Sequence, residues 1–315
     1  MLGEIPYHGI DPVLLPLGGG LAIRWYGLMY LVGFAAGLWI LKKLSRRGFF
    51  PLSPEATADF LLWLVVGVVL GGRLGYALFY EPSLLTHPGD LVKIWTGGLS
   101  FHGGLLGVAV ATILYTRIKK APFWRVGDGL ALAITPGIFL VRMANFINGE
   151  LFGRVAPSRL PWGMRFPRDP VALEKLRELG RLPYVTRNPR EEEVAILKAL
   201  KDGTWEKIAP LVPLRHPSQV YEALLEGVVL GLILWRIYTW DRKKGFRLPP
   251  GAYVAFFLGG YGFFRFFIEF FRQPDPQLGF VLGPFSRGQE LCFLMILAAG
   301  LIYWWCSFRR KSREG

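Results

Sequence analysis

Polar and ionisable side chains interrupt the long apolar segments of this sequence at one recurring depth. Tyr26, His102, Arg142 and Arg265 lie in four different apolar segments. If these segments are membrane-spanning helices, each side chain is about five to seven residues from the outer boundary, which is roughly 7–11 Å at 1.5 Å per residue. An ionisable group near the bilayer centre costs about 3 kcal/mol, so each of these residues needs a partner or a function.

The spacing of further charged residues places them on common helix faces. Arg265, Glu269 and Arg272 follow i, i+4, i+7 spacing, which lines one face of a helix with alternating charge. Glu222 and Glu226 repeat the four-residue spacing in another segment. These carboxylates fall at the depth of the arginines or slightly deeper, so the pattern predicts ion pairs between segments.

Two guanidinium groups in a medium of low dielectric constant suit a phosphate or a phosphodiester. Arginine offers a rigid fork of donors that matches phosphate oxygens. The phosphates nearest to the outer membrane boundary belong to lipid head groups. We therefore expect a lipid substrate that enters sideways between helices, with Arg142 and Arg265 on its phosphate.

Composition indicates the scaffold that must position these groups. The 315 residues have a mean hydropathy of +0.34, 52% hydrophobic residues and only 19% charged residues. The apolar residues form blocks of roughly 20, which excludes a soluble enzyme, a disordered chain and a small disulfide scaffold. The net charge of +14 is better explained by cytoplasmic loops and anionic membrane lipids than by nucleic acid.

The hydropathy pattern predicts an all-α, polytopic membrane helix bundle with seven transmembrane helices in a single domain over residues 1–315. The predicted spans are Leu21–Leu44, Ala56–Tyr80, Gly97–Arg117, Val126–Asn148, Ser218–Trp240, Gly251–Arg272 and Arg287–Cys306. Basic residues cluster after the first, third, fifth and seventh spans, whereas the opposite short segments carry only Lys93. This asymmetry places the N-terminus outside and the C-terminus in the cytoplasm.

One connection, residues 149–217, is long enough to fold by itself. We expect it to form a small extracytoplasmic cap between the fourth and fifth spans, with a short helix over Glu191–Lys201. Long loops are exempt from the rule on loop charge, so its many arginines do not reverse the orientation.

Several residues are better explained by structure than by chemistry. Glycines at four-residue spacing predict close helix packing, and they are Gly67, Gly71, Gly75, Gly103 and Gly107. Arg73 and Arg236 are expected to pair with Asp59 or Glu226, or to extend to the membrane surface. Cys292 has apolar neighbours, which makes its thiol an unreactive one.

Six ordered motifs resemble those of the prolipoprotein diacylglyceryl transferase family. The strongest is RMANFINGELFGR at Arg142–Arg154, and the others are Arg24–Tyr30, Gly72–Tyr76, Gly98–Leu105, His216–Glu222 and Gly262–Asp275. The resemblance implies an enzyme of the bacterial inner membrane whose active site faces the extracytoplasmic side. Its substrates would be phosphatidylglycerol and a preprolipoprotein signal peptide with a lipobox cysteine, with no metal, no organic cofactor and no nucleic acid.

The resemblance also implies which residues matter. They are Tyr26, His102, Arg142, Asn145, Glu150, Gly153, Glu222, Arg265 and Glu269. We assign catalytic roles to His102, Arg142, Arg265 and Tyr26. We assign the binding of phosphatidylglycerol to Arg142, Asn145, Asn148, Glu150, Gly153, Glu222, Arg265 and Glu269. A thiol has a pKa near 8.5 and must lose its proton to become the nucleophile. We take His102 as the base. Three alternatives stay open: a carboxylate base, the phosphate of the substrate, or a His102 that only donates a hydrogen bond to the lipid.

Other classes of membrane protein make different predictions. A transporter or flippase for an anionic lipid would use the same arginines without covalent chemistry, and would need a second polar layer in the cytoplasmic half. A structural or receptor protein would use the Arg–Glu pairs only to hold helices. A CDP-alcohol phosphotransferase needs several spaced aspartates around a divalent metal, of which Asp128 and Gly129 match only a fragment.

Overall fold

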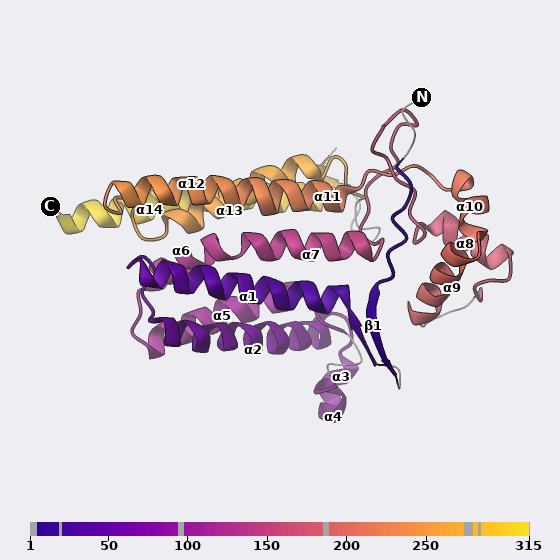
Figure 1. Cartoon of the computed structure of the whole chain (residues 1–315). Helices are drawn as coiled ribbons and strands as arrows, with labels where there is room; N and C mark the ends of the chain where they lie inside the picture. Colours follow the sequence, from indigo (N-terminus) through magenta and orange to yellow (C-terminus); the bar gives the residue numbers. More distant parts are fainter. Residues whose placement is uncertain are drawn as a thin grey trace. The chain divides into compact units, whose positions relative to one another are not determined.

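The computed structural model describes residues 5–18, 21–93, 98–184, 189–273, 280–282 and 285–314, and most of them are helical. The elements, labelled in Figure 1, are β1 (Val13–Gly18), β2 (Leu21–Arg24), α1 (Trp25–Arg46), α2 (Pro54–Phe79), α3 (Ser83–Thr86), α4 (Pro88–Leu91), α5 (Phe101–Ile118), α6 (Phe123–Ala133), α7 (Thr135–Ile147), α8 (Pro170–Glu178), α9 (Pro189–Lys201), α10 (Thr204–Ile208), the 3₁₀ helix η2 (Ala209–Leu211), α11 (Ser218–Glu222), the π-helix η3 (Ala223–Val229), α12 (Leu230–Lys243), α13 (Ala252–Ile268), β3 (Phe280–Leu282), β4 (Phe285–Ser286) and α14 (Arg287–Glu314).

Each apolar segment of the sequence corresponds to a helix or to consecutive helices. Among the described residues, α1, α2 and α14 are long and apolar enough to cross a membrane. The pair α6 and α7, bent by 42° at a short break, would form a fourth span. Helices α5 and α13 are apolar but shorter. The mostly helical character of the chain is therefore confirmed, and its apolar helices are compatible with a helical membrane protein.

The start of the first helix differs from the prediction. Residues Leu21–Arg24 form strand β2, which pairs antiparallel with β1, and helix α1 begins only at Trp25. A second short hairpin joins β3 to β4. The expectation of an all-α chain missed both hairpins, because strands of two to six residues are too short for alternating hydrophobicity to be recognised.

The chain folds into two compact units. The first contains residues 1–33, 135–239 and 256–301, and the second contains residues 34–134, 240–255 and 302–315. Each unit therefore combines segments that are far apart in the sequence.

Helices α2 and α5 of the second unit lie side by side at very short distance (Figure 1). A Cβ atom added to Gly67 would lie 2.6 Å from the carbonyl oxygen of Gly107. One added to Gly75 would lie 2.7 Å from the Cα atom of Gly103, and one added to Gly71 would overlap the Gly103 carbonyl. The prediction that these glycines serve helix packing is confirmed.

Arg73 of α2 anchors the chain that leads into α5. Its guanidinium group donates to the backbone carbonyls of Asp90, Leu91 and Gly98, at 2.8, 2.8 and 3.1 Å. The expected pairing with Asp59 is wrong, because these carbonyls hold the arginine at the other end of the helix. The Ser100 amide donates to the Gly72 carbonyl at 2.8 Å, so α2 fixes the start of the helix that carries His102.

Asp128 of α6 holds the beginning of α13 within the second unit. Its buried carboxylate accepts hydrogen bonds from the backbone amides of Gly251, Tyr253 and Val254, at 2.8, 2.9 and 3.2 Å. Amide groups at a helix start lack partners within the helix, and a carboxylate satisfies them. The position of Asp128 in an apolar segment is thus accounted for by structure.

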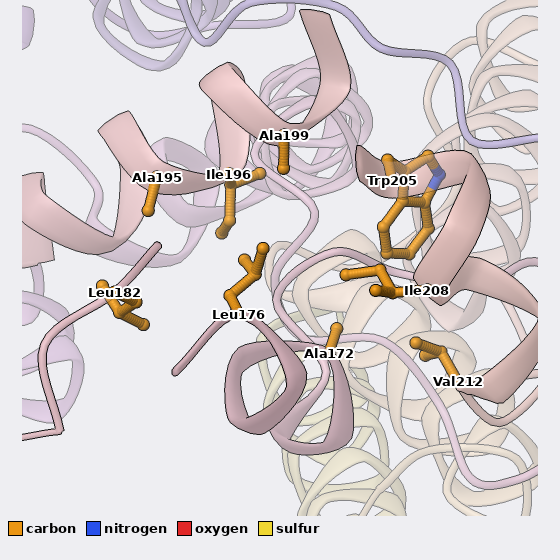
Figure 2. Packing of buried hydrophobic residues seen from close by; sticks show 9 residues of the cluster. All are labelled: Ala172, Leu176, Leu182, Ala195, Ile196, Ala199, Trp205, Ile208 and Val212. Carbon is orange, nitrogen blue, oxygen red and sulfur yellow. The ribbon is translucent and has the colours of Figure 1, made fainter. Parts of the chain in front are cut away.

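Residues 149–217 pack around an apolar cluster of their own, in which helices α8, α9 and α10 take part. The side chains converge between the helices in Figure 2, and they are Ala172, Leu176, Leu182, Ala195, Ile196, Ala199, Trp205, Ile208 and Val212. The helix predicted over Glu191–Lys201 is confirmed as α9.

Replacing Gly71 by leucine tests the close contact of α2 with α5. The new side chain would overlap backbone of α5, so the helices must separate, and we expect a loss of about 1–3 kcal/mol in the free energy of unfolding. Thermal unfolding in detergent measures this loss. Gly300→Leu on α14 is the matched control, since nothing lies within 4 Å of a Cβ atom there. Equal melting temperatures for the two variants would contradict the packing.

Candidate active site

A cluster of six charged residues lies inside the first unit. We call it the arginine–glutamate cluster, and it consists of Arg142, Glu222, Glu226, Arg265, Glu269 and Arg272. Its members come from α7, α11, η3, α13 and the turn that follows α13. Segments separated by more than 100 residues thus meet in the way that the sequence predicted.

Glu222 is the centre of this cluster. Its Oε2 atom lies 2.7 Å from Nε of Arg142 and 3.0 Å from Nη1 of Arg265. Its Oε1 atom accepts a hydrogen bond of 3.2 Å from Nη1 of Arg272. The Glu222 side chain is only 1% exposed, so one buried carboxylate binds three guanidinium groups. Such an arrangement is stable only when the charges stay together, since an unpaired buried charge is costly.

The stripe predicted by i, i+4, i+7 spacing forms the second half of the cluster. Nη2 of Arg265 lies 2.8 Å from Oε1 of Glu269, and Nε of Arg272 lies 3.8 Å from the same oxygen. The other oxygen of Glu269 accepts a hydrogen bond from the Ser286 hydroxyl at 3.0 Å. The backbone amide of Glu269 donates to the Arg265 carbonyl, so helical geometry continues just beyond α13.

The arginines and the glutamates of the cluster differ in burial. The arginine side chains are 14–19% exposed, whereas those of the glutamates are at most 5% exposed. Arg142 contacts Glu222 through Nε, and its terminal nitrogens have no hydrogen-bond acceptor among the residues that the structure describes. The carboxylates are therefore more deeply buried than the guanidinium groups that they bind.

Local backbone features bring α7 and the Glu222 segment together. Glu222 ends α11, and the wider turns of the π-helix η3 follow directly. A Cβ atom on Gly227 would lie 2.7 Å from Cβ of Phe139, and one on Gly231 would lie 2.7 Å from the Thr135 hydroxyl oxygen. These glycines allow the close approach that the Arg142–Glu222 ion pair requires, and π-helical turns are frequent at functional sites.

A second polar group joins the end of α7 to the start of α1. We call it the asparagine network, and it contains Tyr26, Asn145, Asn148 and Glu150. Asn145 Nδ2 donates to Glu150 Oε1 at 2.9 Å and to the Tyr26 hydroxyl at 3.3 Å. Asn148 Nδ2 donates to the same Glu150 oxygen at 3.4 Å. The network presents amide, carboxylate and phenol groups that suit a polyol.

The turn after α7 is held in a conformation that few sequences adopt. Gly149 and Leu151 have positive φ angles of 65° and 55°. The Glu150 carbonyl between them accepts a hydrogen bond of 2.6 Å from Gln219 Nε2, which stabilises the turn from α11. A Cβ atom on Gly149 would lie 2.6 Å from the Tyr7 hydroxyl oxygen, so glycine is required there. Sequence analysis did not assign roles to Gln219 or Tyr7.

Gly153 lies where three chain segments cross. Its amide donates to the His216 carbonyl at 2.8 Å, and it forms an isolated β-bridge with Arg272. Any Cβ atom at this position would overlap the Phe271 carbonyl. Gly153 therefore contributes close backbone approach beside the arginine–glutamate cluster rather than a reactive group.

His216 is a polar residue near Gly153 that the sequence analysis did not single out. Its Nδ1 atom lies 3.2 Å from the Tyr221 hydroxyl oxygen, which accepts a hydrogen bond of 2.8 Å from Trp162 Nε1. Partial burial lowers the pKa of His216 below the usual histidine value, which favours a neutral imidazole near neutral pH. His216 is the first residue of the family motif His216–Glu222, so the motif could have identified it.

His102 belongs to the second unit. It is the second residue of α5, and its side chain is exposed. The other predicted site residues lie in the first unit, in the arginine–glutamate cluster, in the asparagine network, or at Gly153.

Comparison with known proteins identifies the family. The model of the prolipoprotein diacylglyceryl transferase family matches residues 12–305. The chain belongs to the prolipoprotein diacylglyceryl transferase family. A phosphatidylglycerol–prolipoprotein diacylglyceryl transferase of Rhodospirillum rubrum is 42% identical over 308 residues, which cover 96% of this chain and 94% of the relative. Enzymes of the same name from Geobacter sulfurreducens and Erwinia tasmaniensis are 43% and 40% identical, covering 91% and 99% of this chain and 92% and 97% of the relatives.

Membership in this family makes the protein a transferase, and its apolar helices fit a membrane enzyme. The family motifs fall on the residues that the structure assembles. RMANFINGELFGR supplies Arg142, Gly153 and three members of the asparagine network, and the Arg24–Tyr30 motif supplies the fourth, Tyr26. The motif at Gly262–Asp275 supplies Arg265 and Glu269. The resemblance recognised in the sequence is confirmed.

Glu222→Gln tests whether Glu222 is the centre of the cluster. The amide keeps the size of the side chain but leaves three guanidinium groups without their shared charge, so we expect a loss of about 3–5 kcal/mol in the free energy of unfolding. Denaturant or thermal unfolding in detergent measures it. Glu206→Gln, on an exposed position of α10, is the control and should leave stability unchanged. A Glu222→Gln protein as stable as this control would show that the ion pairs do not form.

Proposed function

We propose that this protein transfers the diacylglyceryl group of phosphatidylglycerol to the thiol of the lipobox cysteine of a preprolipoprotein, the first step of lipoprotein maturation. A thioether forms and glycerol phosphate leaves. The observation that carries the proposal is the meeting of Arg142, Arg265 and Arg272 on the buried carboxylate of Glu222. The names of the relatives support the same reaction.

We further propose seven transmembrane spans in the bacterial inner membrane, with the N-terminus outside and the C-terminus in the cytoplasm. The helical segments at every predicted span support this topology, and so does the clustering of Lys and Arg in alternate short loops. In this orientation the arginine–glutamate cluster lies in the outer half of the membrane. Residues 149–217, folded around their own apolar cluster, form an extracytoplasmic cap.

The reaction is a displacement at the glyceryl carbon next to the phosphate. The thiolate forms a C–S bond as the C–O bond to phosphate breaks, and the electron pair of that bond stays on the departing glycerol phosphate. Fixed positive charge beside the leaving group stabilises this change, because preorganised donors are most effective where charge develops. Arg142 and Arg265 supply it, while Glu222 and Glu269 hold the two guanidinium groups in place.

The asparagine network orients the rest of the head group. Asn145, Asn148 and Glu150 offer donors and acceptors that suit the hydroxyl groups of glycerol, and Tyr26 completes the network through its contact with Asn145. Holding the glycerol end fixes the angle between thiolate, carbon and leaving oxygen, and such alignment supplies a large part of many enzymatic rate enhancements.

His102 takes the proton of the incoming thiol in this scheme. A neutral imidazole can accept a proton from a thiol. The hydrogen bond from Ser100 to α2 and the anchoring by Arg73 fix the start of the helix on which His102 stands.

Arginine-to-lysine variants in a transfer assay test the phosphate contact. Purified protein is incubated with phosphatidylglycerol vesicles and a lipobox peptide, and mass spectrometry measures diacylglyceryl on the cysteine. Lysine keeps the charge but loses the fork of donors, so Arg142→Lys and Arg265→Lys should each slow transfer by about 10²–10³-fold. Arg287→Lys, at an exposed surface pair, is the control. Wild-type rates in both site variants would exclude a phosphate contact.

His102→Asn tests the proposed base. With saturating peptide, its rate should fall by about 10²–10⁴-fold, and the pH profile of the rate should change. His87→Asn, in an exposed turn, should keep the wild-type rate and profile. A His102→Asn enzyme with a normal pH profile would assign proton removal to another group.

A further inference from the structure

Glu226 differs from the other carboxylates of the arginine–glutamate cluster. It is 0% exposed, and neither of its oxygens accepts a hydrogen bond from any residue that the structure describes. Its nearest cationic atom, Nη1 of Arg265, lies 3.6 Å from Oε1. Glu222 and Glu269, by contrast, each have oxygens within 3.0 Å of a donor nitrogen.

A buried carboxylate without hydrogen-bond donors is unfavourable. Removing an ionised carboxyl group from water costs several kcal/mol, and only close pairing together with hydrogen bonds offsets this cost. Without them, such a group takes up a proton instead. Arg265 cannot give Glu226 full compensation, because its guanidinium group is already engaged by Glu222 at 3.0 Å and by Glu269 at 2.8 Å.

The charges of the cluster point to the same protonation state. Three arginines face three glutamates, so the cluster is neutral when every carboxyl group is ionised. One protonated carboxyl group leaves a single positive charge. The phosphodiester of phosphatidylglycerol carries a single negative charge. The charge of the cluster balances that of the phosphodiester only when one glutamate holds a proton.

We propose that Glu226 holds this proton, and that it thereby tunes the cluster to the charge of a singly anionic phosphodiester head group. The inference rests on the proposed function and adds a specificity-determining residue to it. A zwitterionic head group brings an ammonium group toward the same arginines, and is therefore bound less well. Loss of the proton from Glu226 cancels the net charge and weakens lipid binding.

Several charged or titratable groups face Glu226. They are Arg142 of α7, Glu222 of α11, Tyr261 and Arg265 of α13, Arg272, and Cys292 of α14. The arginines keep their charge at every pH used in an assay. Glu222 is bound by three guanidinium groups, which favours its ionised form. Glu226 is therefore the carboxyl group of this set whose charge changes as pH rises.

Binding of a short-chain phosphatidylglycerol, measured from about pH 6 to about pH 9 in detergent, tests the proposal. The wild-type affinity should fall by at least about tenfold as pH rises, because deprotonation adds a negative charge beside Arg265, which is proposed to bind the phosphate. Glu226→Gln mimics the protonated side chain, so its affinity should match the wild type at low pH and stay constant. Glu206→Gln, on an exposed position of α10 outside the cluster, should keep the wild-type profile.

Two outcomes overturn the proposal. One is a Glu226→Gln protein that loses affinity at all pH values, which means that the charged carboxylate is needed. The other is an unchanged pH profile in that variant. Infrared spectroscopy of the wild-type protein gives a second reading that does not depend on how the variant folds. A band of a protonated, buried carboxyl group should be present at neutral pH, and its absence also overturns the proposal.

The proposed function and the proposed role of Glu226 are contradicted by different results. If the wild-type protein transfers no diacylglyceryl group from phosphatidylglycerol to a lipobox peptide, the proposed function is wrong. If the wild-type protein binds and transfers, yet Glu226→Gln titrates like the wild type, only the role of Glu226 is wrong. A short-chain phosphatidylethanolamine is measured in the same binding assay. The difference between its affinity and that of the short-chain phosphatidylglycerol gives the expected preference for the anionic head group.

Discussion

One buried carboxylate, that of Glu222, holds three guanidinium groups from separate segments of the chain. In a membrane-spanning protein this arrangement constrains everything around it, because neither the arginines nor the glutamate could remain there alone. It links α7 to α13, because Arg142 and Arg265 bind the same carboxylate oxygen. The remaining features of the first unit follow from keeping these four side chains together.

The backbone meets this constraint with uncommon conformations. The π-helical turns after Glu222, the glycines facing α7, and the left-handed residues Gly149 and Leu151 all depart from regular helix geometry. Each would weaken an ordinary helical bundle, since they reduce regular hydrogen bonding or side-chain packing. Here they bring polar groups of distant segments to one place. The structural cost is concentrated at the candidate active site, where a lipid head group is to be held.

Part of this could be predicted from the sequence for clear physical reasons. Helical spacing alone places Arg265, Glu269 and Arg272 on one face, and four-residue glycine spacing predicts the contact of α2 with α5. The central role of Glu222 could not be predicted, because spacing within one helix does not tell which distant helix lies opposite. Arg73 was assigned the wrong partner for the same reason, since its partners include backbone carbonyls of the short helix α4. The family motifs supplied the function that spacing could not.

The most direct test of the account is the distance between the phosphorus atom of bound phosphatidylglycerol and the guanidinium nitrogens, measured by solid-state NMR on protein with labelled arginines. The account predicts strong coupling to phosphorus that decreases by a substantial fraction in Arg142→Lys and again in Arg265→Lys. Coupling that is absent in the wild-type protein, or unchanged in both variants, would contradict the claim that these arginines hold one head group.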